Sequence, residues 1–298
     1  SRDFWRVARN MSFVNQFAGS GSNAMIQRVT ELTKSDKGTK AVITLLADMT
    51  GDGVTGDSAL EGNEEALRAY DITIELDQLR FANRIAGRLA DQKSVVNFRE
   101  TSRDALAYAM ADRMDQLAFL TLAGVAYTHK TSGGLRTVLA SGQNLSNLEF
   151  ASDVSAPTAA RHRRVSGDTI VAGDTTAITS SDKLKYRHIV DLKAYAKDNY
   201  IRGVRGAGND EVFHLFVTPQ QMAALKLDSD FLANVRNAGI RGPSNQLFAG
   251  SSSLMVDGVM VHEFRHVFNT ATATTGTSAN AGAAGYKWGA NANVVGGR

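Results

Sequence analysis

The feature that most constrains this chain is a strand pattern with little apolar sequence around it. Residues 71–77 read Asp-Ile-Thr-Ile-Glu-Leu-Asp, so polar and apolar side chains alternate with the period of two that is typical of a β-strand. The flanking residues are mainly polar, among them Gly62, Glu64, Glu65 and Arg80. Such a strand cannot build a core alone, and its unpaired backbone groups invite another chain. We therefore expect the segment to complete its contacts on a second copy or on another protein.

Composition excludes several classes of protein. The chain has 298 residues, enough to bury a substantial core in one or two domains, and it contains no cysteine. A disulfide framework and any cysteine-based zinc or redox site are therefore excluded. The longest apolar stretch, near residues 118–127, is too short to span a bilayer, and the first residues show no signal-peptide pattern. We expect no membrane as a partner.

Charge is segregated along the chain, although the formal net charge is only +3. From Asp48 to Asp104 there are twelve acids and seven bases, a balance of −5, and from Pro157 to Arg205 there are ten bases and five acids, a balance of +5. Such segregation can match one subunit to its neighbour, or it can belong to the solvated faces of a monomer. The residues that we predict to lie at contacts between subunits are Glu64, Glu65, Glu75, Asp77, Arg80, Arg161, Arg163, Arg164 and Arg202.

The clearest single element is a long helix that starts at Thr101 and stops at Gly124. Thr101 can cap it, and Asp104 follows three residues later near the positive end of the helix dipole. At 1.5 Å per residue the helix is about 33 Å long, which suits a strut across a domain. Its predicted apolar stripe consists of Leu106, Met110, Met114, Leu117 and Thr121, with Leu120 beside it.

Shorter patterns precede this helix. Apolar spacing predicts an amphipathic helix over residues 4–18, a short helix over 23–33 and a compact strand over 41–47. Residues 81–92 fit a helix and a strand equally well, and their state stays open.

Further elements follow the long helix. A helix opens near Thr179 and Asp182 and runs to Tyr200, and a buried strand covers residues 212–217. Thr218-Pro219 then occupies the cap and first-turn positions of another helix. The pair Asp257-Gly258 predicts a two-residue hairpin turn between two short strands.

The strongest pattern for catalysis is His262-Glu263-Phe264-Arg265-His266, which formally matches a zinc-protease motif. That chemistry requires a helix, whereas this motif continues the second strand of the hairpin, where residues four apart are separated by about 13 Å. A third metal ligand is also missing. A zinc-dependent metallopeptidase that uses His262, Glu263 and His266 is kept as an alternative. We nevertheless expect that the protein is not an enzyme, has no catalytic residue and binds no metal.

Two glycine-rich segments do not support a cofactor site. Residues 19–24 resemble a dinucleotide fingerprint but follow a helical pattern instead of a strand. Residues 51–57 have the glycine spacing of a phosphate loop, but Asp57 stands where lysine is required, and a carboxylate repels phosphate. We therefore expect no cofactor.

The order of elements resembles that of the tailed-bacteriophage major capsid proteins, and more narrowly of the podovirus-type coat protein family. Motifs that fit this family occur from about residue 41 to the end of the chain, and their order carries the resemblance. These motifs are Gly53-Val54-Thr55-Gly56-Asp57, Leu60-Glu61-Gly62-Asn63-Glu64-Glu65, Leu122-Ala123-Gly124, Ala156-Pro157-Thr158-Ala159-Ala160-Arg161, Leu215-Phe216-Val217-Thr218-Pro219-Gln220-Gln221, Asn245-Gln246-Leu247-Phe248-Ala249-Gly250 and Val259-Met260-Val261-His262-Glu263.

This resemblance implies an α+β fold, the tailed-phage major capsid protein fold, in five parts. They are an N-terminal arm (1–40), an extended loop with flanking strands (41–97), a peripheral domain (98–165) with a spine helix at 101–124, an axial domain (166–269), and a C-terminal loop and return strand (270–298).

It also implies a structural protein that assembles into hexamers and pentamers of an icosahedral capsid around double-stranded DNA. The implied partners are other copies of the chain, scaffold, portal and decoration proteins, and packaged DNA through non-specific contacts of the inner face. The implied location is the virion, after assembly in the host bacterial cytoplasm. A non-viral compartment shell of the same fold remains an alternative, and we predict no covalent cross-link, because no Lys–Asn pair can be assigned to it.

Overall fold

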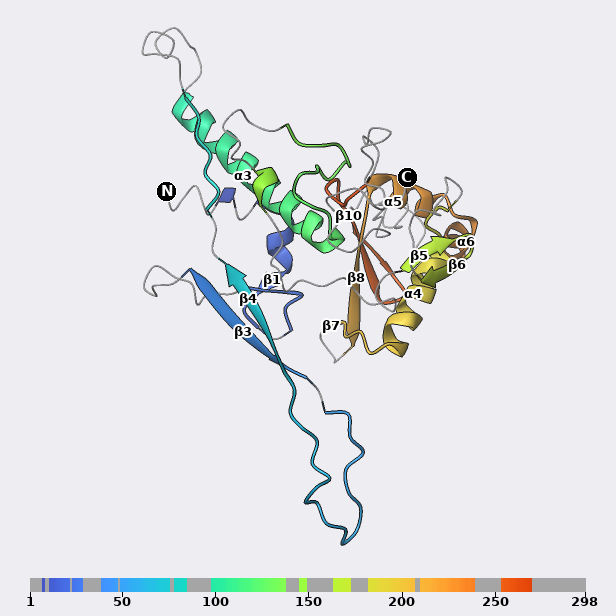
Figure 1. Ribbon diagram of the computed structural model, residues 1–298. Coiled ribbons are helices and arrows are strands. Elements are labelled where there is room, and N and C mark those ends of the chain that lie inside the picture. Colours follow the sequence, from blue (N-terminus) through green and yellow to red (C-terminus); the bar gives the residue numbers. More distant parts are fainter. Residues whose placement is uncertain are drawn as a thin grey trace. The chain divides into compact units, whose positions relative to one another are not determined.

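The computed structural model divides the chain into two compact units, which we treat separately. The main unit comprises residues 1–28, 81–150 and 155–298, and the loop unit comprises residues 29–80 and 151–154. Helices and sheets occur together in the main unit, as the predicted α+β class requires (Figure 1). The residues that the structure describes are 7–8, 11–21, 23–28, 39–47, 49–75, 78–84, 98–137, 145–148, 163–172, 182–206, 210–238 and 253–269.

Helix α3 (Phe98–Ala123) confirms the predicted long helix. It begins three residues before Thr101 and ends at Gly124, whose φ of +67° is a conformation that favours glycine. In the residue after Gly124, the amide of Val125 donates to the carbonyl of Leu120, which satisfies one of the last carbonyls of the helix. No helix in the described part of the chain is long and apolar enough to cross a membrane.

The buried face of α3 differs from the predicted stripe. Thr121 is exposed, and Leu106, Met114 and Leu117 are only half-buried. Two polar side chains, Asp115 and Gln116, are buried on this face, so the apolar pattern alone could not predict which face is buried. The buried residues of the helix are Ala107, Met110, Ala111, Asp115, Gln116, Phe119 and Leu120.

Buried Asp115 fastens the N-terminal segment to α3. Its carboxylate accepts hydrogen bonds from Ser12 Oγ at 2.7 Å and from the amides of Phe13 and Val14 at 3.0 Å each. These amides begin the short 3₁₀ helix η1 (Val14–Phe17), where a negative charge is favourable. Phe13 also stacks on Phe264 with ring centroids 4.2 Å apart. Asp115 and Phe264, about 100 and about 250 residues away in the sequence, thus hold this segment.

The helices predicted near the N-terminus are only partly confirmed. Val7, Ala8 and Met11 are helical, but the chain turns at Ser12 before η1, so no continuous helix runs to residue 18. The helix predicted over 23–33 is wrong in its described part. Strand β2 (Ile26–Gln27) lies there and pairs in parallel with β1 (Ala18–Gly19).

A four-stranded sheet organises the second half of the main unit. Its order is β7 (Val204–Arg205), β8 (Glu211–Val217), β10 (Val259–Glu263) and β9 (Ser253–Val256). Strands β8 and β10 are parallel, whereas the two outer pairs are antiparallel. The tight turn between β9 and β10 has positive φ at Asp257 and Gly258, as a primed hairpin turn requires, and confirms that prediction.

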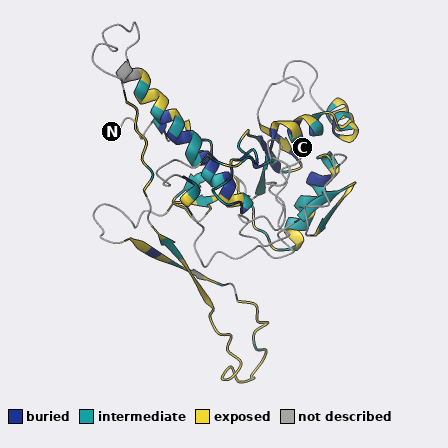
Figure 2. Ribbon diagram, turned by 45° about the horizontal axis from the view of Figure 1, so that its top comes forward, coloured by how far each residue is buried: buried dark blue, intermediate teal, exposed yellow. Residues whose placement is uncertain are grey.

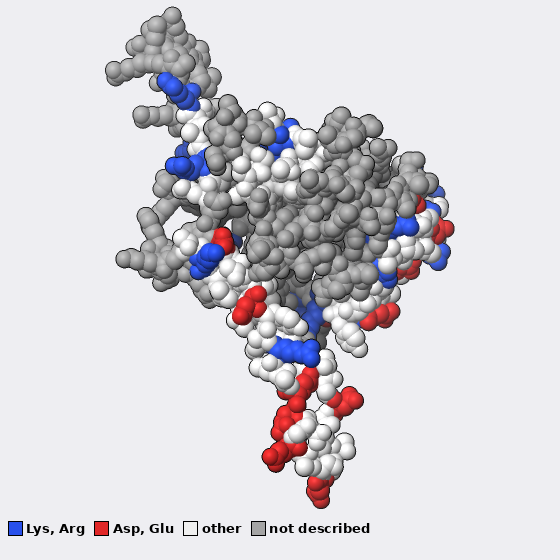
Figure 3. Space-filling view, viewed as in Figure 1, with Lys and Arg blue, Asp and Glu red and all other residues white. Residues whose placement is uncertain are grey.

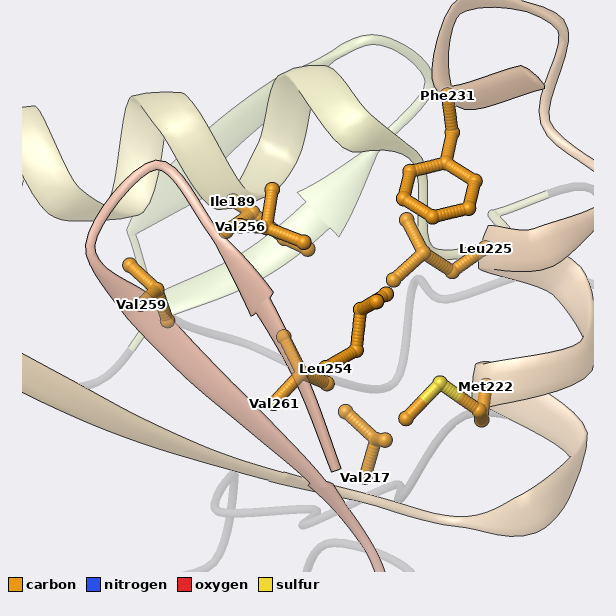
Figure 4. Close-up of a cluster of buried hydrophobic side chains, with 9 residues drawn as sticks. All are labelled: Ile189, Val217, Met222, Leu225, Phe231, Leu254, Val256, Val259 and Val261. Carbon is orange, nitrogen blue, oxygen red and sulfur yellow. The ribbon is translucent and has the colours of Figure 1, made fainter. Parts of the chain in front are cut away.

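Three helices pack beside this sheet: α4 (Tyr186–Asp198), α5 (Pro219–Lys226) and α6 (Ser229–Ala238). The predicted Thr218 cap is confirmed, since its hydroxyl accepts from the amide of Gln221. Figure 4 shows the apolar side chains converging from these helices and strands. The buried core consists of Ile189, Val217, Met222, Leu225, Phe231, Leu254, Val256, Val259 and Val261.

The helix predicted to open near Thr179 and Asp182 starts later, at Tyr186, and stops at Asp198. Tyr200 therefore lies outside it, 91% exposed and with a φ of +55°. The remaining described elements of the main unit are the hairpin β5 (Arg163–Ser166) and β6 (Thr169–Ala172) and the 3₁₀ turn η2 (Leu145–Asn147).

The loop unit is one long hairpin. Strand β3 (Lys40–Leu46) pairs antiparallel with β4 (Ala69–Glu75), which confirms both strand patterns, and a long connection joins the strands. The hairpin and its connection are mostly exposed (Figure 2). Among the described residues of this unit only Ala41 is buried. The unit has no core of its own, as expected for two strands.

Asp115 provides a test of how the main unit is held together. We expect Asp115→Ala to lower the free energy of unfolding of the unassembled protein by about 3 kcal/mol, because it leaves buried donors without an acceptor. Asp104→Ala, at an exposed site on the same helix, should change it by less than about 0.5 kcal/mol. Urea denaturation of both variants measures the difference. Equal effects would show that the carboxylate does not anchor the N-terminal segment.

Candidate assembly surface

One face of the hairpin is apolar, and part of it is exposed. Residues paired across two strands share a face, and Ile43 pairs with Ile72, Ala41 with Ile74. Tyr70 lies on this face too, two residues from Ile72. Tyr70 is 60% exposed and Ile72 42% exposed. The partner strand thus adds apolar surface that the pattern of residues 71–77 alone did not predict.

The opposite face and the connection expose further large apolar side chains. On the face that carries Thr44 and Asp71, which are hydrogen-bonded at 2.7 Å, Val42 is 57% exposed and Leu46 65%. Exposed apolar residues are normal singly, but a concentration of them marks an interaction surface. The large apolar residues exposed in the connection are Met49, Leu60 and Leu67.

The connection between the strands is strongly acidic. Residues 49–67, which we call the acidic loop, contain five acids and neither lysine nor arginine. Figure 3 shows acidic side chains along the projecting part of the loop unit. Gly53, Gly56 and Gly62 have positive φ, so glycine is needed at three of its turns. The five acids are Asp52, Asp57, Glu61, Glu64 and Glu65.

Two of these acids hold the loop itself. Glu65 accepts from the amides of Thr50 at 2.8 Å and Gly51 at 2.7 Å, and from the Thr50 hydroxyl at 3.0 Å. The Thr50 amide, followed by the Gly51 amide, lowers the pKa of Glu65 below its ordinary value. Glu64 accepts from the amide of Gly62 at 2.8 Å. Both residues were predicted to face a neighbour, and both already have partners within the loop.

Three more of the predicted contact residues belong to the loop unit. Glu75 forms an ion pair with Lys40 across the hairpin, and both side chains are mostly exposed. Arg80, at the end of the loop unit, is exposed. Asp77 lies outside the described residues.

Apart from Arg80, the predicted bases belong to the main unit. The guanidinium of Arg163, on β5, lies 3.9 Å from the ring centroid of Tyr195, a cation–π contact. The Nε atoms of Arg163 and Arg164 are buried and have no acceptor among the described residues. Arg202 is exposed, and Arg161 lies outside the described residues. The predicted acids thus lie in the loop unit and every predicted base except Arg80 in the main unit, and their pairing between copies stays a prediction.

The residues of the zinc-protease pattern do not converge. His262 lies on β10, as predicted, and its Nε2 is 3.0 Å from Nδ1 of His214. His266 follows the strand, and its Nε2 is 2.6 Å from Asp112 Oδ1. Burial, followed by the charge of His214, lowers the pKa of His262. In the described part of the chain no three His, Asp or Glu side chains form a metal-binding group.

A basic pocket beside α3 was not predicted. It has a volume of about 460 Å³, and three separate stretches of sequence contribute to it. No local pattern links them, although Arg265 and His266 belong to the zinc-protease motif. The residues that line the pocket are Asp112, Arg113, Gln116, Lys130, Thr131, Ser132, Arg136, Arg265 and His266.

Glu65 should control local order in the acidic loop. We expect Glu65→Ala to remove the hydrogen-exchange protection of the Thr50 and Gly51 amides, whereas Glu64→Ala should leave it unchanged. In the unmodified protein this protection should be present at neutral pH and be lost as the pH falls through the lowered pKa of Glu65, since a depressed carboxyl pKa stabilises the folded form only while the group is ionised. Protection that persists in Glu65→Ala would contradict this role.

Comparisons with known proteins show the family of this chain. A family model described as phage capsid protein matches residues 4–296. Over 299 residues the chain is 52% identical to the major capsid protein of Pseudomonas phage KPP25, covering 99% of this chain and 76% of that relative.

Two solved structures share the fold at low identity. The capsid of Ralstonia phage GP4 has a TM-score of 0.59 at 22% identity, over 86% of this chain and 70% of its own. The capsid of cyanophage Pam1 has a TM-score of 0.63 at 18% identity, over 85% of this chain and 69% of its own. They confirm the predicted tailed-phage capsid fold. The family match over nearly the whole chain and the identity of 52% show that this chain belongs to the phage capsid protein family, as a structural protein of the virion and not an enzyme.

Proposed function

We propose that the protein assembles into hexamers and pentamers of a closed icosahedral shell around packaged double-stranded DNA. The observation that carries this proposal is the loop unit, which has no core of its own and exposes the acidic loop together with Tyr70 and Ile72 on its apolar face. Burying apolar surface contributes about 25 cal/mol per Å², so covering this hairpin with another copy is favourable. A shell supplies such a cover for every subunit.

The finer details of assembly are part of the same proposal and rest on the family resemblance. The five parts of the chain act as arm, extended loop, peripheral domain, axial domain and C-terminal segment. Assembly takes place in the host bacterial cytoplasm with scaffold and portal proteins, and decoration proteins bind the finished shell. The inner face contacts DNA without sequence preference, through phosphate charge.

The acidic loop should be needed for assembly but not for folding. We expect replacement of residues 49–67 by a short Gly-Ser linker to keep β3 and β4 paired and leave the melting temperature unchanged. The same variant should form no shells, because the segment that reaches a neighbour is gone. Circular dichroism and sedimentation measure the two properties. Shells of normal size from this variant would overturn the proposal.

The variant Leu120→Asp should have the opposite effect to the loop replacement, because it should damage folding itself. Leu120 is fully buried on α3, so this variant places an unpaired charge in the core and should prevent folding of the subunit itself. A Leu120→Asp protein that folds and assembles would contradict the assigned role of α3.

Arg163 and Arg164 should contribute to contacts between copies, because the Nε atom of each has no hydrogen-bond acceptor among the described residues. Exposed charge pairs contribute only about 0–1 kcal/mol each, but a shell repeats them at every interface. We expect replacing both with Gln to raise the protein concentration needed for assembly, and added salt to have less effect on this variant than on the unmodified protein. Light scattering against salt concentration measures both. An unchanged salt dependence would reject the pairing.

A further inference from the structure

The basic pocket beside α3 is lined by more cationic than anionic side chains. Its one carboxylate, Asp112, accepts from Arg113 at 2.9 Å, from Arg265 at 2.7 Å and lies 2.6 Å from His266. Lys130 and Arg136 also line the pocket. Four permanent cations therefore share a single anion.

Two of these cations form no hydrogen bond with a carboxylate among the described residues. Arg136 donates from Nε to the carbonyls of Tyr127 and His129 and from Nη2 to Gln116 Oε1, all of them neutral acceptors. Burial, followed by the charge of Arg113, lowers the pKa of Arg136, as expected where positive charge is in excess. Lys130 is exposed, and its ammonium group contacts no acid within the described residues. The pocket is thus arranged to receive an anion.

The acidic loop has the opposite imbalance. Glu64 and Glu65 are engaged within the loop, but Asp52, Asp57 and Glu61 are exposed and form no ion pair or hydrogen bond with any described residue. No base lies in residues 49–67 to neutralise them. One chain therefore presents three unpaired carboxylates on one unit and an under-neutralised basic pocket on the other.

We propose that the basic pocket of one copy binds carboxylates of the acidic loop of a second copy. Guanidinium groups bind carboxylates with paired hydrogen bonds, and a compact ammonium such as that of Lys130 adds a less directional charge. This inference rests on the proposed function, because it names the surface that receives the loop in the shell.

The absence of cysteine makes a cross-linking test direct. We would prepare Ser132→Cys, at the pocket, and separately Asp52→Cys, Asp57→Cys and Glu61→Cys, at the loop, and assemble the pocket variant with each loop variant under oxidising conditions. Because no chain carries both cysteines, a disulfide between two chains of different tag size reports contact between copies only. We expect such a heterodimer with at least one loop position. Tyr200→Cys, exposed but outside the pocket, replaces Ser132→Cys in the control and should form none.

Charge variants test the same contact without a cross-link. We expect Lys130→Glu to raise the protein concentration needed for assembly by about threefold or more, since each weak charge contact recurs throughout the shell. Lys183→Glu, at an exposed lysine outside the pocket, should leave it unchanged. Replacing Asp52, Asp57 and Glu61 with Asn, Asn and Gln should remove the sensitivity to Lys130→Glu.

The outcomes separate the inference from the proposed function. The inference is wrong if shells form without any loop–pocket heterodimer and Lys130→Glu changes the concentration needed for assembly no more than Lys183→Glu does. The proposal of a shell would then still hold. Inorganic phosphate or a DNA duplex that abolishes the heterodimer without affecting shells would assign the pocket to phosphate groups, which also overturns the inference. Absence of shells from the unmodified protein, with its natural partners present, overturns both.

Discussion

A two-stranded hairpin cannot bury its own side chains, and this constraint governs how the protein is built. Strands β3 and β4 satisfy each other's backbone along one edge only, and their apolar residues have no helix or second sheet to cover them in the described part of the loop unit. A monomer with this hairpin exposed would be prone to associate. For a capsid protein, association with other copies is what assembly requires.

The main unit can support such a hairpin because it has its own cores. Leu225 and Val261 are fully buried in the core beside the four-stranded sheet, and Leu120 is fully buried on α3. Asp115 adds a long-range polar contact that fixes the N-terminal segment against the same helix. Stability and association are thereby assigned to different parts of the chain, so that changes in one need not damage the other.

Elements with strong local signals could be predicted from the sequence. The stop at Gly124, the Thr218-Pro219 cap and the Asp257-Gly258 turn each depend on neighbours within a few residues, and the structure confirms them. The predicted helix over residues 4–18 does not continue past Ser12, because the amides of Phe13 and Val14 donate to the carboxylate of Asp115, about a hundred residues away. The basic pocket escaped prediction for the same reason, since Asp112, Lys130 and Arg265 meet only through tertiary packing. Contacts between copies depend on still more distant partners, which neither propensity nor spacing encodes.

The most direct test of this account is a reconstruction of assembled particles at a resolution that shows side chains. The account predicts that Tyr70, Ile72 and the acidic loop, exposed in the single chain, are covered by a neighbouring copy in the shell. Particles in which Tyr70 and Ile72 remain in contact with solvent, and the acidic loop contacts no other subunit, would contradict it.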